Sequence, residues 1–175
     1  VALAADIDLA GVNYDWTTHA VAVTNANNDC TIDVPAFTGV FDGKNHKITG
    51  FKPTVELAAG TTFGLFPVIK GATIKNVTLT GEMTVSAKET ADAGMFVGTA
   101  FNSTIKNVTV NGKLVSTGGQ VDNKRFALAG ICGFIIAKEG QKSLVEGCTS
   151  NVEVNAAPGA NTKNGATCVM YGGIV

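Results

Sequence analysis

The six residues Thr73-Ile-Lys-Asn-Val-Thr78 return letter for letter as Thr104-Ile-Lys-Asn-Val-Thr109. Their surroundings repeat as well. A Phe-Gly-Leu-Phe group precedes the first copy and an Ala-Gly-Met-Phe group precedes the second, while an apolar residue, a polar residue and a glycine follow each copy. A spacing of 31 residues has the length of a supersecondary unit. We therefore interpret the repeat as a duplicated structural unit.

The centre of the repeat is a four-residue pattern: apolar, polar, Gly or Asn, apolar. It occurs four times, at Ile48-Thr-Gly-Phe51, Ile74-Lys-Asn-Val77, Ile105-Lys-Asn-Val108 and Val145-Glu-Gly-Cys148. The first and fourth residues of a flat strand face opposite sides, so both reach a core only if the backbone turns between them. Gly and Asn tolerate the left-handed conformation that such a turn needs. We predict structural corners at Gly50, Asn76, Asn107 and Gly147. Where the corner residues are asparagines, we expect their stacked side chains to form a hydrogen-bonded ladder.

The fold class follows from the flanks of this pattern. They are rich in Thr and β-branched residues with a period of two, and no helical period separates the expected strands. A second signature, Gly followed by apolar residues, begins at Gly64, Gly94, Gly130 and Gly173. Stacked units would close a core that one unit cannot bury alone. We predict an all-β chain, a parallel β-helix (solenoid) of about four short coils, with a β-sandwich of hairpins as the alternative.

Composition limits the classes of function. Charged residues are 15% of the chain, hydrophobic residues are 45%, and the net charge is −1. This predicts neither a nucleic-acid partner nor a basic membrane-binding face. The longest stretch without a polar side chain, 126–137, is too short to span a bilayer. We expect one domain, with residues 1–36 as lead-in and cap of the first coil and 37–175 as repeats, and no cofactor.

The segment Phe37-Thr-Gly-Val-Phe-Asp-Gly-Lys-Asn-His-Lys-Ile-Thr-Gly-Phe51, followed by Gly64-Leu-Phe66, resembles the GLUG-motif repeat proteins of bacteria. The lead-in at 5–9 is similar to theirs, whereas Pro67 stands where they usually have glycine. The resemblance covers most of 1–115. It implies a right-handed β-helix in a secreted or surface-anchored, adhesin-like protein, with an extracellular or cell-surface location. It implies no reaction.

Two classes of function are therefore compared. The first is a non-enzymatic module that serves adhesion, carbohydrate contact or spacing. The second is a polysaccharide-active enzyme, a lyase or glycoside hydrolase, because such enzymes share the architecture. Those reactions need paired carboxylates or a cation cluster, but Arg125 is the single arginine and no acidic residue recurs at equivalent repeat positions. We expect no catalysis. A purely structural spacer is a third alternative.

The ligand site is expected in the insertions between repeats, at 82–92, 113–128 and 153–171. Stacked repeats place such insertions on one edge of a solenoid, where they often form a binding face. The expected partner is a glycan or a host or cell-surface protein. The candidate binding residues are the exposed polar groups of these loops: Lys88, Glu89, Asp92, Gln120, Asp122, Asn123, Lys124, Arg125, Asn161, Lys163 and Asn164.

Other candidates for chemistry have simpler interpretations. Asp6 and Asp8 are weak candidates for a calcium site, and we interpret them as the solvent side of a first strand whose Ile7 and Leu9 face the core. His46 lies in a tight turn, with no partner that the sequence can name. Cys132 falls where Phe66 and Phe96 stand in earlier repeats, and Cys148 falls where Val77 and Val108 stand. We interpret both as small apolar fillers, with a disulfide between them as the alternative.

The last residues restart a repeat. Gly172-Gly-Ile-Val175 begins the Gly-apolar signature without a following corner. A coil that ends there leaves an unpaired backbone edge beside the core. We expect the native protein to continue as a longer chain, or a flanking domain or a neighbouring chain to cover this coil.

Overall fold

The structure is a computed structural model that describes residues 1–23, 33–87, 89–117, 125–156 and 168–175, with the backbone alone at 125, 156 and 168–171. The described part is all-β, and its single helix is the short 3-10 helix η1 (Trp16–His19). Its strands form three sheets. Every strand pair is parallel except β2 with β6.

The eight-stranded sheet contains β1 (Ile7–Asp8), β3 (Val40–Asp42), β4 (Lys47–Phe51), β5 (Thr54–Leu57), β8 (Thr73–Ala87), β11 (Thr104–Ser116), β14 (Leu144–Glu146) and β15 (Thr149–Ala156). The five-stranded sheet contains β2 (Val21–Ala22), β6 (Thr61–Phe63), β9 (Ala91–Gly94), β12 (Arg125–Ala129) and β16 (Cys168–Gly172). The three-stranded sheet contains β7 (Phe66–Lys70), β10 (Val97–Phe101) and β13 (Cys132–Ile136).

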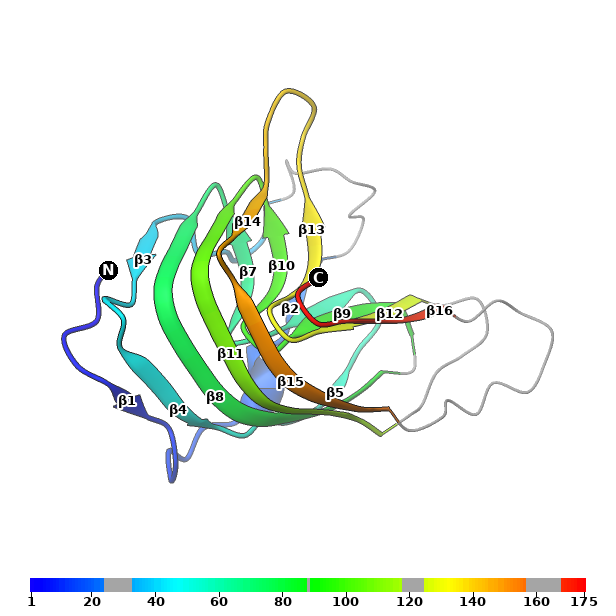
Figure 1. Ribbon diagram of the computed structural model, residues 1–175. Coiled ribbons are helices and arrows are strands. Elements are labelled where there is room, and N and C mark those ends of the chain that lie inside the picture. The colour runs from blue at the N-terminus through cyan, green and yellow to red at the C-terminus, as the bar shows by residue number, and fades with distance from the viewer. Residues whose placement is uncertain (24–32, 88, 118–124, 157–167) are drawn as a thin grey trace.

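The chain visits the three sheets repeatedly in one order. From β6 it passes to β7 and then to β8, and the series β9, β10, β11 follows the same route, as does β12, β13, β14 with β15. Each new strand lies beside its predecessor from the previous circuit, and Figure 1 shows these strands stacked from cyan through green to orange. A residue therefore has its equivalent directly beside it in the next circuit.

The strand register confirms the repeat. Thr73 pairs with Thr104, Ile74 with Ile105 and Val77 with Val108, so the two copies of the six-residue motif lie side by side. The same register continues to the pair Val85 and Ser116. Hairpins would pair neighbouring strands antiparallel, so the alternative β-sandwich is wrong for the described strands.

The predicted corners all have left-handed backbones. The φ angles are 73° at Gly50, 56° at Asn76, 52° at Asn107 and 62° at Gly147. The turn at Asn76 lets Ile74 and Val77, at 0% and 2% exposure, face the same core. The corner prediction is confirmed at all four positions.

The placement of the first copy of the pattern is wrong. Ile48 pairs with Leu79 and not with Ile74, whose partner is Phe41. The corner beside Asn76 consists of Lys44 and Asn45, which both have positive φ, and the Asn45 amide donates to the Asn76 carbonyl. Gly50 belongs to the next bend of the sheet. The first circuit turns at two left-handed residues, Lys44 and Asn45, and neither belongs to the four-residue pattern. The pattern at 48–51 therefore does not lie beside the one at 74–77.

The Gly-apolar signature is also partly displaced. Gly94 pairs with Ala129, so Gly130 lies one position beyond its expected place. The register between Val97 and Thr99 sets Gly98 beside Pro67 on one side and Gly133 on the other. Glycine therefore occupies this position in two of the three circuits.

The core is one large cluster between the sheets, with a smaller second cluster around Val68, Phe101 and Ile136. Phe66 contacts Phe41 and Phe96 edge-on, with ring centroids 5.2 Å and 5.6 Å apart. At the N-terminal end of the stack, Trp16 packs against Phe51 at 5.1 Å. Aromatic pairs in these geometries add to the stabilisation from burial.

The insertions are shorter than expected. Residues 82–87 continue β8 and residues 113–116 continue β11, because Met83, Val85 and Leu114 alternate inward with polar neighbours. This period of two is a strand pattern. Residues 91–92 likewise belong to β9.

Candidate functional site

The predicted loop site lies mostly outside the described residues. This holds for Lys88, Gln120, Asp122, Asn123, Lys124, Asn161, Lys163 and Asn164, and for the side chain of Arg125. Glu89 is half-buried, and Asp92 is only 9% exposed. The expectation that Asp92 is an exposed loop residue is wrong, because it lies in β9, which pairs on both sides with β6 and β12.

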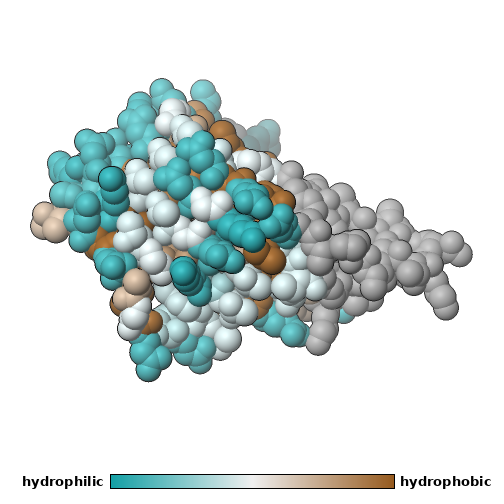
Figure 2. All heavy atoms as spheres, turned by 60° about the horizontal axis from the view of Figure 1, so that its bottom comes forward, coloured by the Kyte–Doolittle hydropathy of each residue, from teal (hydrophilic) through white to brown (hydrophobic). Residues whose placement is uncertain are grey.

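A regular polar face occupies the outer side of the eight-stranded sheet. Inward residues Ile48, Leu79 and Val110 are at most 5% exposed, so their neighbours in β4, β8, β11 and β15 point away from the core. Figure 2, which brings the bottom of Figure 1 forward, shows hydrophilic and intermediate residues over most of the visible surface. The first rank of this polar face contains Lys47, Thr78, Thr109 and Thr149. The second contains Thr80, Asn111 and Asn151, and Thr49 of β4 continues it at the point where the register between β4 and β8 shifts.

The second rank extends to β1, where Asp8 pairs with Thr49. Thr49 Oγ1 donates to Asp8 Oδ1 at 3.2 Å, and Asn151 Nδ2 donates to Asn111 Oδ1 at 2.9 Å. The hydroxyls of Thr78, Thr80, Thr109 and Thr149 make no hydrogen bond to another described residue. Their donor and acceptor capacity therefore faces solvent.

Charges flank the polar face on both sides and largely cancel. On one side, Lys75 pairs with Asp42 at 3.5 Å and Lys106 pairs with Glu146 at 3.0 Å. On the other side, the register sets Lys113 between Glu82 and Glu153. The face is polar without a dominant charge, which gives charged ligands little electrostatic attraction.

The corner beside the face carries the predicted Asn ladder. Asn107 Nδ2 donates to Asn76 Oδ1 at 3.2 Å, and Asn76 Nδ2 donates to Asp42 Oδ1 at 3.1 Å. The Lys44 amide also donates to Asp42. These bonds, led by the Lys44 amide, lower the pKa of Asp42 to about 2. The ladder is confirmed, and its role is structural.

Asp6 and Asp8 serve as acceptors for local hydrogen bonds. Asp6 Oδ1 accepts from the Lys47 amide at 2.9 Å and lies 3.0 Å from His46 Nδ1, while Asp8 accepts from the Ala10 amide. The Lys47 amide and then His46 lower the pKa of Asp6. Among the described residues, no three His, Cys, Asp or Glu side chains form a group that could hold a metal ion. The partner of His46 was missed by sequence reasoning because Asp6 is 40 residues away.

Ile7 pairs with the buried Ile48 and so lies on the core side of the sheet as expected, but it is 37% exposed. Leu9, in contrast, packs against the core as expected. The exposure of Ile7 agrees with the position of β1 at the edge of its sheet.

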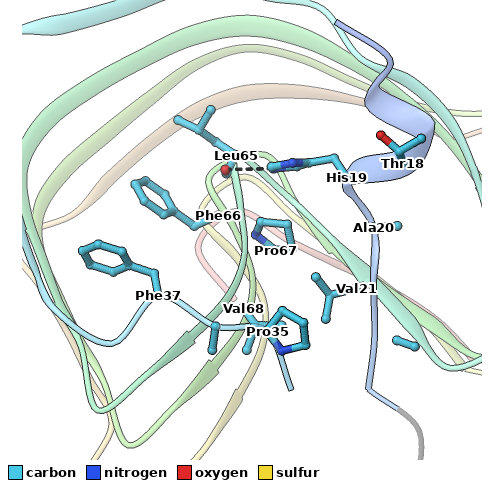
Figure 3. A pocket seen from close by; sticks show the side chains of 12 residues that line it. Thr18, His19, Ala20, Val21, Pro35, Phe37, Leu65, Phe66, Pro67 and Val68 are labelled. Carbon is cyan, nitrogen blue, oxygen red and sulfur yellow. Dashed lines mark hydrogen bonds between the residues drawn. The ribbon is translucent and has the colours of Figure 1, made fainter. Parts of the chain in front are cut away.

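An apolar groove of about 620 Å³ lies beside η1 and β7. Figure 3 shows Phe37, Pro67, Val21 and Val68 around it, with His19 at one end. His19 Nε2 lies 3.2 Å from the Leu65 carbonyl, which can only accept, and Nδ1 lies 3.1 Å from the Tyr14 hydroxyl. Both ring nitrogens are engaged, so the imidazole offers no free group to a ligand.

Cys132 and Cys148 are free thiols, so the alternative disulfide is wrong. Cys132 pairs with Val97, the equivalent of Phe66. The predicted equivalence with Phe96 is therefore wrong by one position. Complete burial raises the pKa of Cys132 to about 12, and partial burial raises that of Cys148. Both behave as apolar fillers.

Comparison with protein-family models, with curated proteins and with solved structures finds no match to this chain. In the described part of the chain, no helix has the length and hydrophobicity needed to cross a membrane. Interpretation of function therefore depends on the geometry itself. The polar face was missed by sequence reasoning, although Thr78-Leu-Thr80, Thr109-Val-Asn111 and Thr149-Ser-Asn151 recur in the sequence and give the signal for it.

Proposed function

We propose that the chain is a right-handed parallel β-helix of the kind that the GLUG-motif resemblance implies. The proposal is supported by three sheets visited in a constant order and by parallel pairing between equivalent strands. Each circuit connects two parallel strands of the same sheet, and such connections are almost always right-handed. An experimental structure with left-handed circuits would contradict the proposed hand.

On this fold we propose a non-enzymatic module for adhesion or carbohydrate contact. The observation that carries the proposal is the polar face, where hydroxyl and amide groups are arranged in register and the hydroxyls of Thr78, Thr80, Thr109 and Thr149 are unpaired within the described structure. A ligand rich in hydroxyl groups satisfies such a surface without placing a charge in it. The fold alone would be a weak argument for any function.

The proposed setting is a bacterial cell surface or a secreted protein, with a glycan or a cell-surface protein as partner. The setting is supported by the sequence resemblance. A flanking domain or neighbouring chain would pair with the outer edges of β13, β15 and β16, beside which no further strand lies in the described residues. Open strand edges are the sites at which chains add strands to one another.

The test is binding of the purified chain to a glycan array and to intact bacterial and host cells. Saturable binding to a defined glycan or cell type is expected, with the glycan recovered uncleaved. Release of new reducing ends or unsaturated sugars would instead establish the polysaccharide-active enzyme. Absence of binding to every glycan and cell surface would leave the structural spacer as the function.

A further inference from the structure

We propose that the polar face binds a neutral, unbranched polysaccharide that lies across the strands, along the stack. This inference rests on the proposed function and specifies its ligand class and its site. It is carried by the spacing of the two ranks, by their unpaired hydroxyls and by the balance of the surrounding charges.

The spacing matches the size of a sugar ring. Neighbouring strands lie about 4.8 Å apart, and alternate residues of one strand lie about 6.6 Å apart. A step from Thr78 to Thr109 therefore moves along the stack by roughly the length of one pyranose unit in an extended β-linked chain. Within β8, Thr78 and Thr80 are separated by roughly the width of a sugar ring. A ring that lies over the strand would therefore have one of these residues on each of its two sides.

The hydrogen-bonding groups are available to such a ligand. In the stacked series, Thr78, Thr109 and Thr149 present hydroxyls that bond to no other described side chain. A hydroxyl both donates and accepts, as sugar hydroxyls do. The corner ladder is different, because Asn76 and Asn107 donate within the protein. The hydroxyls of the first rank and of Thr80 are therefore free to bind, whereas Asn111 and Asn151 of the second rank, like the corner, already share a hydrogen bond.

The charge balance selects neutral chains. Lys106 pairs with Glu146, and Lys75 shares Asp42 with Lys44. Lys113 lies between two glutamates. A uronate or sulfated polysaccharide would find no cationic row on this face, and charge-assisted bonds are the strong ones for such anions.

The length of the site gives a quantitative expectation. The first rank crosses four strands, β4, β8, β11 and β15, and the second is in continuous register on the last three. Each hydrogen bond made in water contributes little net free energy, so affinity must accumulate over several rings. Affinity should rise from disaccharide to tetrasaccharide and then level off.

The experiment titrates the whole chain with neutral β-1,4-linked glucose and N-acetylglucosamine oligomers, from disaccharide to hexasaccharide, by calorimetry and by amide chemical shifts. Matched double variants locate the site. Thr78→Val with Thr109→Val removes two face hydroxyls, whereas Thr73→Val with Thr104→Val removes two from the same strands on the other side of the Asn corner. All four side chains are half-buried. Similar unfolding midpoints for the two double variants show that both are folded.

The expected result is a loss of affinity of about tenfold for the first pair and little change for the second. Equal losses in both pairs, or affinity that does not depend on length, would overturn the placement of the ligand. Binding to charged or branched glycans alone would overturn this inference and leave the adhesion module intact. Failure to bind any glycan would overturn the glycan-contact proposal as well.

Discussion

Asn107 donates a hydrogen bond of 3.2 Å from Nδ2 to Oδ1 of Asn76, its equivalent in the preceding circuit. Both residues also hold left-handed backbones, with φ angles of 52° and 56°. Each asparagine therefore has two roles, since it tolerates the corner and links adjacent strands. Glycine can fill the first role, as it does at 147, but not the second.

Asn107→Val should lower the free energy of unfolding by about 1–2 kcal/mol, because a β-branched residue is strained in the left-handed region and the ladder bond is lost. Asn107→Gly should cost less, about 1 kcal/mol or below, since only the bond is lost. Urea unfolding of the two variants measures the difference. Equal stability of Val and Gly at this position would contradict the corner.

The bend of the large sheet depends on a close backbone approach at Gly112. Its φ is 129°, and a Cβ there would meet the carbonyl of Gly81. Gly112→Ala should therefore destabilise by about 2 kcal/mol or more. Gly71 is the matched control, because its φ is also positive but a Cβ would meet nothing. Gly71→Ala should cost about 1 kcal/mol, and thermal unfolding of both variants should show this order.

Asp42 should give stability a specific dependence on pH. Its folded-state pKa of about 2 lies below the usual 3.8, so the stabilisation is present above pH 3.8 and is lost as pH falls towards 2. Asp42→Asn should be less stable than the unmodified chain near neutral pH, and the difference should close near pH 2. Unfolding midpoints of both proteins across this range provide the measurement. A difference that persists at pH 2 would mean that the carboxylate charge is not its source.

Cys132 should be chemically inert in the folded protein. Burial raises its pKa to about 12, and the thiolate is the reactive form. Alkylation followed by peptide mapping should label Cys132 only after unfolding. Cys132→Val should be tolerated better than Cys132→Ser, because Val97 is the equivalent residue in the adjacent strand, whereas serine would bury a more polar group, which only partly recovers that cost by donating to the Phe134 carbonyl as the thiol does. Rapid labelling under native conditions would contradict the burial.

Several features of the fold could be predicted from sequence because they depend on local geometry repeated at a fixed spacing. Asn76 and Asn107 identified their corner, and the repeat gave the pairing of β8 with β11. Ile48 was aligned with Ile74 because a four-residue pattern is short enough to recur at positions that are not structurally equivalent. The spacing of 31 residues from Ile48 leads to Leu79, its actual partner, and so was a better guide than the letters.

The candidate site was harder to predict. Sequence reasoning placed binding in the insertions, since polar clusters between repeats resemble loops. Asp92 instead lies within a sheet, because the alanines on either side of it face the core. The polar face combines residues from four strands, and each contributes only two side chains. The recurring polar–apolar–polar segments signal such a surface, but only the register shows that they lie side by side.

The central claim is that equivalent residues of successive circuits lie side by side in parallel register. Interstrand nuclear Overhauser contacts between residues 73–85 and 104–116 test it directly. The structure predicts contacts at a constant offset of 31 positions along both strands, as between Thr78 and Thr109. Contacts whose offset changes steadily along the strands, the pattern of an antiparallel pair, would contradict the stacked circuits and with them the polar face.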